Sequence, residues 1–149
     1  MIKYSLIGGF FLIILSSSSY SRQSEDTFSL TVRVEKLRNS AGTVKFGLYN
    51  RDGSIPDQSF KKCYRVMSAE IVNCKSTVTF YNIPKGKYAV TILHDENNNG
   101  KIDRGIILPQ EGIGFSNFKT IDLSNRPSFV KASFDLKTDS DILIQLVYM

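Results

Sequence analysis

The chain is poor in the residues on which metal, redox and nucleophilic chemistry usually depend. Its 149 residues include one histidine and two cysteines, too few for the four nitrogen and sulfur ligands of a structural zinc site. The cysteines, Cys63 and Cys74, do not form the C-x-x-C pattern of redox-active pairs. No Gly-x-Ser-x-Gly nucleophile turn is present either. A zinc centre and a redox-active dithiol are therefore not expected, and catalysis lacks a recognisable motif.

Two other features are missing. The chain has 19 basic and 14 acidic residues, but the basic ones are spread along it. Nucleic-acid binding would require a clustered basic stripe with stacking aromatic residues. After the N-terminal region, no apolar run reaches the roughly 20 residues that cross a bilayer. We therefore expect neither a nucleic-acid partner nor a membrane span in the mature protein.

The N-terminus carries the pattern of a secretory signal peptide. Lys3 precedes a nearly unbroken apolar run over Leu6–Leu15, which is followed by Ser16–Ser19. We predict a signal peptide over residues 1–21 and a single domain over residues 22–149. Loss of Lys3 leaves 18 basic against 14 acidic residues, a mature charge of about +4. No cysteine lies near the cleavage point, so the expected location is the periplasm or the medium, without a lipid anchor.

Cys63 and Cys74 have a second possible role. In an oxidising compartment, an isolated pair at this spacing predicts a disulfide. A bridge closing a loop of about 12 residues stabilises the fold by a little under 3 kcal/mol in the chain-entropy model. Two free buried thiols are the alternative.

The dominant pattern of the mature chain is alternation of apolar and polar residues with a period of two, which is typical of strands. No window shows a helical stripe, and only one helical turn, from Pro127-Ser128 to Ala132, is predicted. Six or seven short strands separated by turns every 8–12 residues indicate an all-β protein, an antiparallel Greek-key sandwich of immunoglobulin-like type. The predicted strands are Leu30–Glu35, Val44–Tyr49, Tyr64–Val72, Thr77–Tyr81, Tyr88–Leu93, Phe134–Leu136 and Ile142–Tyr148.

One long stretch, from Asp95 to about Arg126, shows little alternation. Structureless loops beyond about 15 residues are uncommon in compact domains, and those that occur are usually functional or held in place. Within it, Phe115 and Phe118 could form a stacking platform for a ligand or plugs that tie the loop to the core. The pair Gly112-x-Gly114 is followed by no predicted helix, so it does not predict a phosphate-binding turn.

The start of this stretch resembles a calcium-binding loop. Oxygen-bearing side chains recur every second residue and are followed by Gly100, where the chain can turn sharply. Ca²⁺ takes six to eight oxygen ligands, including backbone carbonyls such as that of Lys101. The predicted ligands are Asp95, Asn97, Asn99, Lys101, Asp103 and Glu111.

The match fails at its twelfth position, Ile106, where a glutamate normally closes the shell. Glu111 is the nearest carboxylate that could replace it. Because two early ligands are amides, we expect weak binding, with Kd roughly 10⁻⁴ to 10⁻³ M. The alternative is that Asn99-Gly100 is a plain two-residue hairpin turn.

The single histidine, His94, allows an enzymatic alternative. A small secreted hydrolase could use His94 with the loop carboxylates, and Glu96 with Glu111 could form a pair for glycoside cleavage. Nothing in the sequence fixes the separation of those two carboxylates near the required 5 to 9 Å or so. We therefore expect His94 to pack or hydrogen-bond at the edge of the sandwich, or to orient Asp95, and we expect no enzymatic activity.

The motifs together resemble a family of exported bacterial proteins classed as a domain of unknown function, over about Phe28 to Tyr148. That resemblance implies a transthyretin-like or Cna-B-like seven-stranded sandwich and no established activity; the cysteine pair is a departure from the family's motifs. The motifs are Ile83-Pro84-x-Gly86-x-Tyr88-Ala89-Val90, His94-Asp95-Glu96-Asn97-x-Asn99-Gly100-Lys101-x-Asp103, Pro109-x-Glu111-Gly112-x-Gly114-Phe115-Ser116-Asn117 and Pro127-Ser128-Phe129.

These observations lead to one functional expectation. The chain should be an exported, monomeric, non-enzymatic binding or structural module of the envelope or medium. A Ca²⁺-stabilised loop would shape its surface for an unidentified protein or glycan partner.

Overall fold

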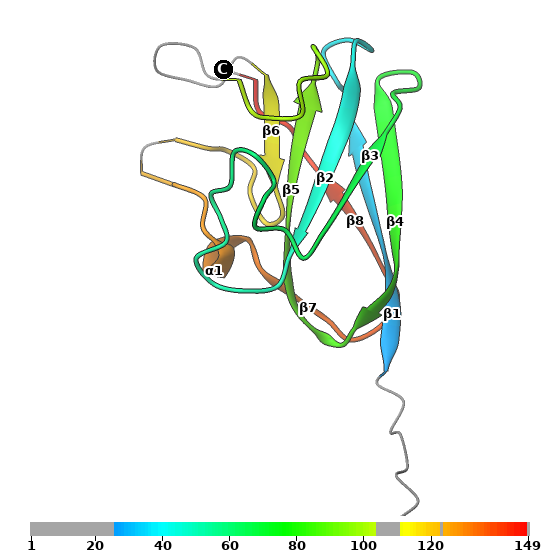
Figure 1. The fold of residues 1–149 in the computed structure, drawn as a ribbon, viewed down its shortest axis with the longest axis vertical. Coiled ribbons are helices and arrows are strands. Elements are labelled where there is room, and N and C mark those ends of the chain that lie inside the picture. Colours follow the sequence, from blue (N-terminus) through cyan, green and yellow to red (C-terminus); the bar gives the residue numbers. More distant parts are fainter. Residues whose placement is uncertain (1–25, 104–110, 123, 149) are drawn as a thin grey trace, which may run out of the picture.

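The computed structural model describes residues 26–103, 111–122 and 124–148. Within these ranges the chain forms strands and one short helix (Figure 1). The elements are β1 (Thr27–Glu35), β2 (Thr43–Tyr49), β3 (Arg65–Ala69), β4 (Lys75–Pro84), β5 (Gly86–Asp95), β6 (Gly112–Phe115), α1 (Phe129–Ala132), β7 (Phe134–Leu136) and β8 (Ser140–Ile144). The predicted signal peptide, residues 1–21, lies outside the described residues.

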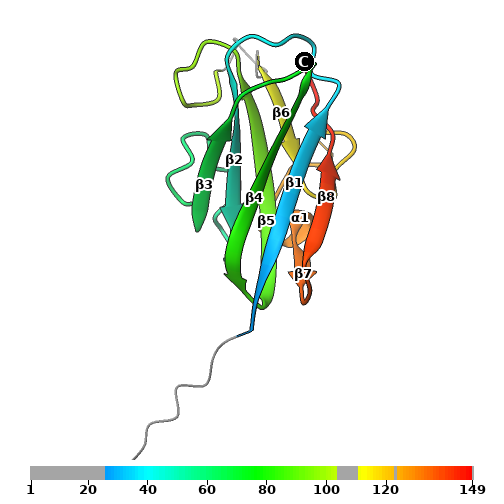
Figure 2. The same cartoon turned by 90° about the vertical axis from the view of Figure 1, so that its right-hand side faces the viewer.

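The strands form two sheets that pack face to face as a β-sandwich (Figures 1 and 2). The first sheet has the order β4-β1-β8, and the second has the order β3-β2-β5-β6, with β7 paired to the start of β5. The all-β expectation is confirmed, but the described strands number eight rather than seven. The expectation of purely antiparallel pairing is wrong at one place, because β8 runs parallel to β1.

The core between the sheets is built by the alternation that the sequence shows. Val32 of β1, Phe46 of β2, Phe80 of β4 and Ile92 of β5 are all buried in one cluster. Successive strand side chains point to opposite faces, so every second residue of these strands faces the other sheet. These inward residues bury the apolar surface whose removal from water drives folding.

A second apolar cluster covers the other face of the second sheet, here called the outer face. Strand residues such as Tyr49 and Leu93 contribute to it, together with Phe60 and Phe118 from the loops and Phe129 from α1. In Figure 1 the loop after β2 and the segment around α1 lie over this side of the sheet. Both faces of β2 and β5 are therefore buried, which explains why β5 is apolar on both sides.

Strand β6 lies inside the stretch that was expected to be loop. Two glycines hide its alternation, and the structure explains both. A Cβ on Gly112 would lie 2.4 Å from the Tyr148 ring, and one on Gly114 would lie 2.6 Å from the Gln145 carbonyl oxygen. Real Cβ atoms do not approach other atoms so closely, so the C-terminal segment can cross β6 only where side chains are absent.

The predicted helical turn is confirmed as α1. Ser128 precedes it with extended backbone, and its hydroxyl accepts the N–H of Lys131 at 3.3 Å. This is the N-cap role for which serine is favoured. Phe129 and Ala132 are the buried residues of the turn, and they fasten it to the outer face.

The expected disulfide between Cys63 and Cys74 is wrong for this structure, because both are free thiols. Cys63 precedes β3 and packs on the outer face, whereas Cys74 follows β3 and packs on the core between the sheets. The five residues of β3 lie between them, and at about 3.3 Å per residue a strand of that length spans roughly 16 Å. A disulfide needs Cα atoms within about 7 Å.

No helix in the ranges that the structure describes is long and apolar enough to cross a membrane.

Candidate metal centre

The loop that follows β5 is fastened to the outer face of the second sheet. Lys45 of β2 donates from Nζ to the carbonyl oxygen of Gly100 at 2.7 Å. The backbone N–H of Ile102 donates to the carbonyl of Gln58 at 3.0 Å. The loop is thereby held both by the sheet and by the neighbouring loop, so its shape does not depend on its own residues alone.

Asp95, the last residue of β5, organises the first turn of the loop. Its Oδ1 accepts the N–H of Asn99 at 3.0 Å, and its Oδ2 accepts the N–H of Gly100 at 2.7 Å. The turn is possible because Asn98 and Gly100 adopt left-handed backbone, with φ of 57° and 79°, a region open to glycine and tolerated by asparagine. The predicted sharp bend at Gly100 is therefore present.

The two amides and the second aspartate converge. Asn97 Nδ2 and Asn99 Nδ2 both donate to Asp103 Oδ2, at 2.6 and 2.7 Å. These two hydrogen bonds lower the pKa of Asp103. Three of the predicted ligands are therefore in direct contact, and their amide groups would have to turn over to offer oxygen to a cation instead.

Glu111, the first residue before β6, closes the loop. Its Oε1 accepts the N–H of Glu96, and its Oε2 accepts the N–H of Asp103, each at 3.1 Å. One carboxylate thus joins the start of the loop, at Glu96, to its middle, at Asp103, and its side chain is buried. Burial, together with the negative charges of Asp95 and Asp103, raises the pKa of Glu111.

The plain two-residue hairpin is wrong as an alternative. Strand β5 pairs with β6 from His94 opposite Gly112 onward, so the connection runs from Glu96 to Glu111 rather than over Asn99-Gly100 alone. Ile106, the position where the calcium pattern fails, lies outside the described residues.

Carboxylates alone do not make a metal site here. Over the described ranges, His, Cys, Asp and Glu side chains form no group of three or more placed to hold a metal. Amide and backbone oxygens would have to complete the shell, as they do in Ca²⁺ sites. For Lys101, the structure gives a hydrogen bond from its backbone N–H to Asn99 Oδ1 at 3.0 Å, which leaves its predicted role as a carbonyl ligand untested.

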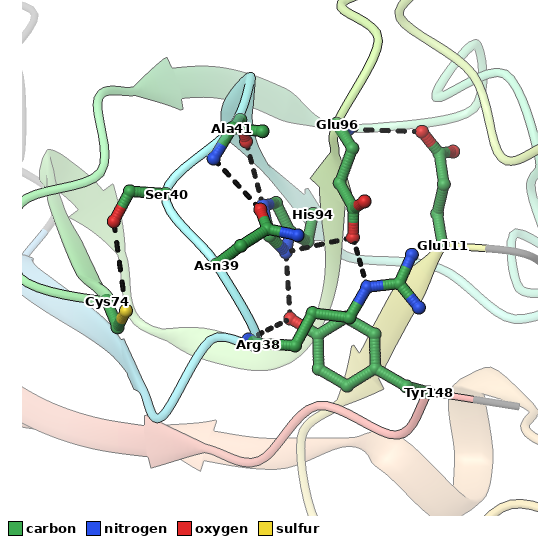
Figure 3. A network of polar contacts seen from close by, with 9 residues as sticks. All are labelled: Arg38, Asn39, Ser40, Ala41, Cys74, His94, Glu96, Glu111 and Tyr148. Carbon is green, nitrogen blue, oxygen red and sulfur yellow. Dashed lines mark hydrogen bonds and ion pairs between the residues drawn. The ribbon is translucent and has the colours of Figure 1, made fainter.

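His94 lies at the centre of a different network, on the inner face of β5 (Figure 3). Its ring is fully buried. Nε2 lies 2.9 Å from the carbonyl oxygen of Ala41, and Nδ1 lies 2.8 Å from the hydroxyl of Tyr148. Because a carbonyl only accepts, Nε2 carries a hydrogen, and in the neutral ring Nδ1 accepts the Tyr148 hydroxyl hydrogen.

The same network includes an ion pair. Arg38 Nε donates to Glu96 Oε1 at 2.5 Å, and this contact lowers the pKa of Glu96. The guanidinium of Arg38 also lies over the Tyr148 ring, 4.9 Å from its centre. His94 Nδ1 lies 3.7 Å from the same Glu96 oxygen. His94 thus hydrogen-bonds at the edge of the sandwich, as one interpretation of the sequence predicted.

This arrangement separates the His94 ring from the Asp95 carboxylate, although it leaves the ring near Glu96. Neighbouring strand residues point to opposite faces, so His94 faces the inter-sheet side while Asp95 faces the loop. The contacts of His94 are with Ala41, Glu96 and Tyr148, not with Asp95. The idea that His94 orients Asp95 is therefore not supported by its contacts.

Residues 32–143 match the family described as "Uncharacterized protein conserved in bacteria (DUF2141)". The chain belongs to this family. No curated protein and no solved structure matches the chain. Family membership confirms the expectation of a bacterial domain of unknown function.

In this DUF2141 chain the matched region runs from β1 into β8 and includes the whole loop after β5. It stops short of Tyr148. Sequence reasoning missed Arg38 and Tyr148 as members of this network, because Tyr148 lies 54 residues from His94 and 110 from Arg38. No local pattern marks such contacts.

Phe115 and Phe118 belong to the outer-face cluster. Both are buried, with ring centres 5.9 Å apart and planes tilted by 60°. Their buried rings fasten the segment after β6 to the sheet, which agrees with the interpretation that they tie this stretch to the core.

Proposed function

We propose that this DUF2141 chain is an exported, non-enzymatic β-sandwich module whose loop from Asp95 to Glu111 is stabilised by Ca²⁺. The module would act in the envelope or medium as a binding or structural protein, with a protein or glycan partner. The Greek-key arrangement and the relation to transthyretin-like and Cna-B-like sandwiches belong to the same proposal.

One observation carries the calcium proposal. The Glu111 carboxylate is buried and accepts the backbone N–H groups of Glu96 and Asp103, and the negative charges of Asp95 and Asp103 act on it. Like charges that share a partly dry site repel one another. A divalent cation among them would remove this repulsion and use the amide oxygens of Asn97 and Asn99 as further ligands.

The enzymatic alternative has no comparable support. A general base must come within hydrogen-bond reach of its substrate, and both ring nitrogens of the buried His94 already have partners.

Calorimetric titration and thermal unfolding of the chelator-treated mature chain test the proposal. With Kd of about 10⁻⁴ to 10⁻³ M, 10 mM CaCl₂ should stabilise the fold by about 1.4 to 2.7 kcal/mol. Asp103→Asn should remove most of this gain.

The matched control is Asp122→Asn. Asp122 is an exposed aspartate that accepts hydrogen bonds from Ser124 and Asn125, away from the loop. It should leave the calcium response unchanged. An absence of heat and of stabilisation in the unmodified chain would refute the calcium site, and an equal response in both variants would place the ion elsewhere.

A further inference from the structure

The two sheets do not close against each other along one side of the sandwich. There, a groove of about 480 Å³ lies between β6 at the edge of the second sheet and β8 at the edge of the first. Its volume falls within the range of about 300 to 1,000 Å³ that is usual for small-molecule sites. In Figure 2 β8 lies at the edge of the nearer sheet, with β6, α1 and β7 behind it.

The groove walls are mainly apolar. Six hydrophobic side chains contribute, from the β6 segment, β7 and β8, and Leu143 is 54% exposed. An exposed leucine beside buried phenylalanine and isoleucine presents apolar surface whose contact with water is unfavourable, and such surface marks binding sites. The six are Phe115, Phe118, Phe134, Ile142, Leu143 and Ile144.

Both ends of the groove are fixed by hydrogen bonds. At one end, Val147 crosses over and pairs with Ile113 through two backbone bonds of 3.0 and 2.8 Å. At the other end, Asn117 Nδ2 donates to the carbonyl of Ser133 at 2.8 Å, which joins the segment after β6 to the connection between α1 and β7. Hydrogen bonds thus hold the segments that border the groove at both of its ends.

These bonds also restrict what can bind on the β6 side of the groove. A peptide strand added to β6 would need its free edge, and there both backbone groups of Ile113 are already bonded to Val147. A short flexible molecule does not need that edge.

The charged side chain of Lys119 indicates which head group a molecule bound in the groove would carry. Lys119 lies in the lining and is exposed, and no Asp or Glu is among the lining residues. In the described part of the chain, Lys119 takes part in none of the ion pairs. A lone cation beside an apolar groove complements a molecule with an apolar tail and an anionic head.

We propose that the groove between β6 and β8 binds a single-chain anionic amphiphile of the alkyl carboxylate class. The tail lies along Phe115, Phe134 and Leu143, and the carboxylate meets Lys119. This site is separate from the calcium loop and does not depend on it.

Calorimetric titration of the mature chain with dodecanoate, below its micelle concentration and in the presence of chelator, tests the proposal. Leu143→Ser removes part of the apolar wall and should weaken binding about tenfold, since a partly buried leucine is worth roughly 1.4 kcal/mol. Val130→Ser is the matched control, because Val130 is also exposed, at 67%, but does not line the groove.

Lys119→Glu tests the head group. It should weaken dodecanoate binding and strengthen binding of dodecyltrimethylammonium, whereas Lys85→Glu, at an exposed lysine outside the lining, should do neither. Absence of dodecanoate binding by the unmodified chain, or unchanged affinity in Leu143→Ser, would overturn the proposal. So would a dimer in sedimentation that Leu143→Ser dissociates, since a second copy would then occupy the groove.

Discussion

The Tyr148 hydroxyl lies 2.8 Å from His94 Nδ1, and this contact fastens the C-terminal segment to β5. The same hydroxyl accepts the backbone N–H of Arg38 at 3.2 Å. One phenol therefore connects three segments that are far apart in the sequence, at the end of the sandwich from which the candidate loop projects.

Tyr148→Phe should reduce the free energy of unfolding by about 1 to 2 kcal/mol, because it leaves the buried His94 nitrogen without its partner. Urea unfolding measures this loss. Tyr81→Phe is the control, since Tyr81 is 63% exposed, and it should change stability little. Equal effects from both substitutions would show that the His94 contact contributes nothing.

Gly112→Ala should destabilise the fold by about 1 to 3 kcal/mol through overpacking, because the new Cβ would meet the Tyr148 ring. Combining it with Tyr148→Ala tests the cause. If the ring is the obstacle, the double variant should lose less stability than the two single losses added together. Strictly additive losses would contradict this explanation.

The stability of the calcium-free chain should depend on Glu111 through pH. Burial and the nearby Asp95 and Asp103 raise its pKa above the ordinary 4.5, so the folded chain binds more protons than the unfolded chain. Its contribution is therefore fully present below about pH 4.5 and is lost as the pH rises through the folded-state pKa. Urea unfolding in chelator over this interval should show the decline.

Glu111→Gln separates this contribution from those of other groups. The difference in unfolding free energy between the variant and the unmodified chain should shrink as the pH rises, because only the carboxylate acquires a repelled charge. Glutamine also loses one acceptor for the N–H groups of Glu96 and Asp103, which should cost about 1 to 3 kcal/mol at low pH. A difference that does not vary with pH would contradict the raised pKa.

Cys63 and Cys74 should behave as two independent free thiols rather than as a disulfide. Because Cys63 and Cys74 are free, a reducing agent should leave the melting temperature unchanged, and thiol titration should count two groups in the unfolded chain. Burial raises the pKa of Cys63, so it carries little thiolate near neutral pH and should react slowly with iodoacetamide in the folded chain. A drop in melting temperature on reduction would indicate a bridge instead.

The alternation of Val44, Phe46 and Leu48 was enough to predict β2 and its inward face. The outer face was harder to predict, because Tyr49 and Gly47 are buried by loop residues such as Phe60, which are distant in sequence and carry no periodic signal. For β6, the decisive information lies in Tyr148 and Gln145, which require glycine opposite them and so erase the alternation that would mark a strand.

The candidate site likewise has features that the sequence could predict and features that it could not. The spacing of Asp95, Asn97, Asn99 and Asp103 predicts a calcium loop, and the structure brings these side chains together through local hydrogen bonds. That Glu111 supplies the closing ligand of a calcium shell stays a prediction, and in the structure its carboxylate accepts the N–H groups of Glu96 and Asp103. The disulfide prediction failed because spacing along the chain does not tell on which face of a sheet each cysteine packs.

Strand β1 pairs with β4 on one side and with β8 on the other. The first strand of the domain therefore obtains half of its neighbours only when the last strand arrives. A chain that emerges from its N-terminus therefore cannot complete its first sheet until β8 has appeared. Until then the edge of β1 that β8 occupies keeps its backbone N–H and C=O groups exposed to water, and the sheet is limited to the pair β4-β1.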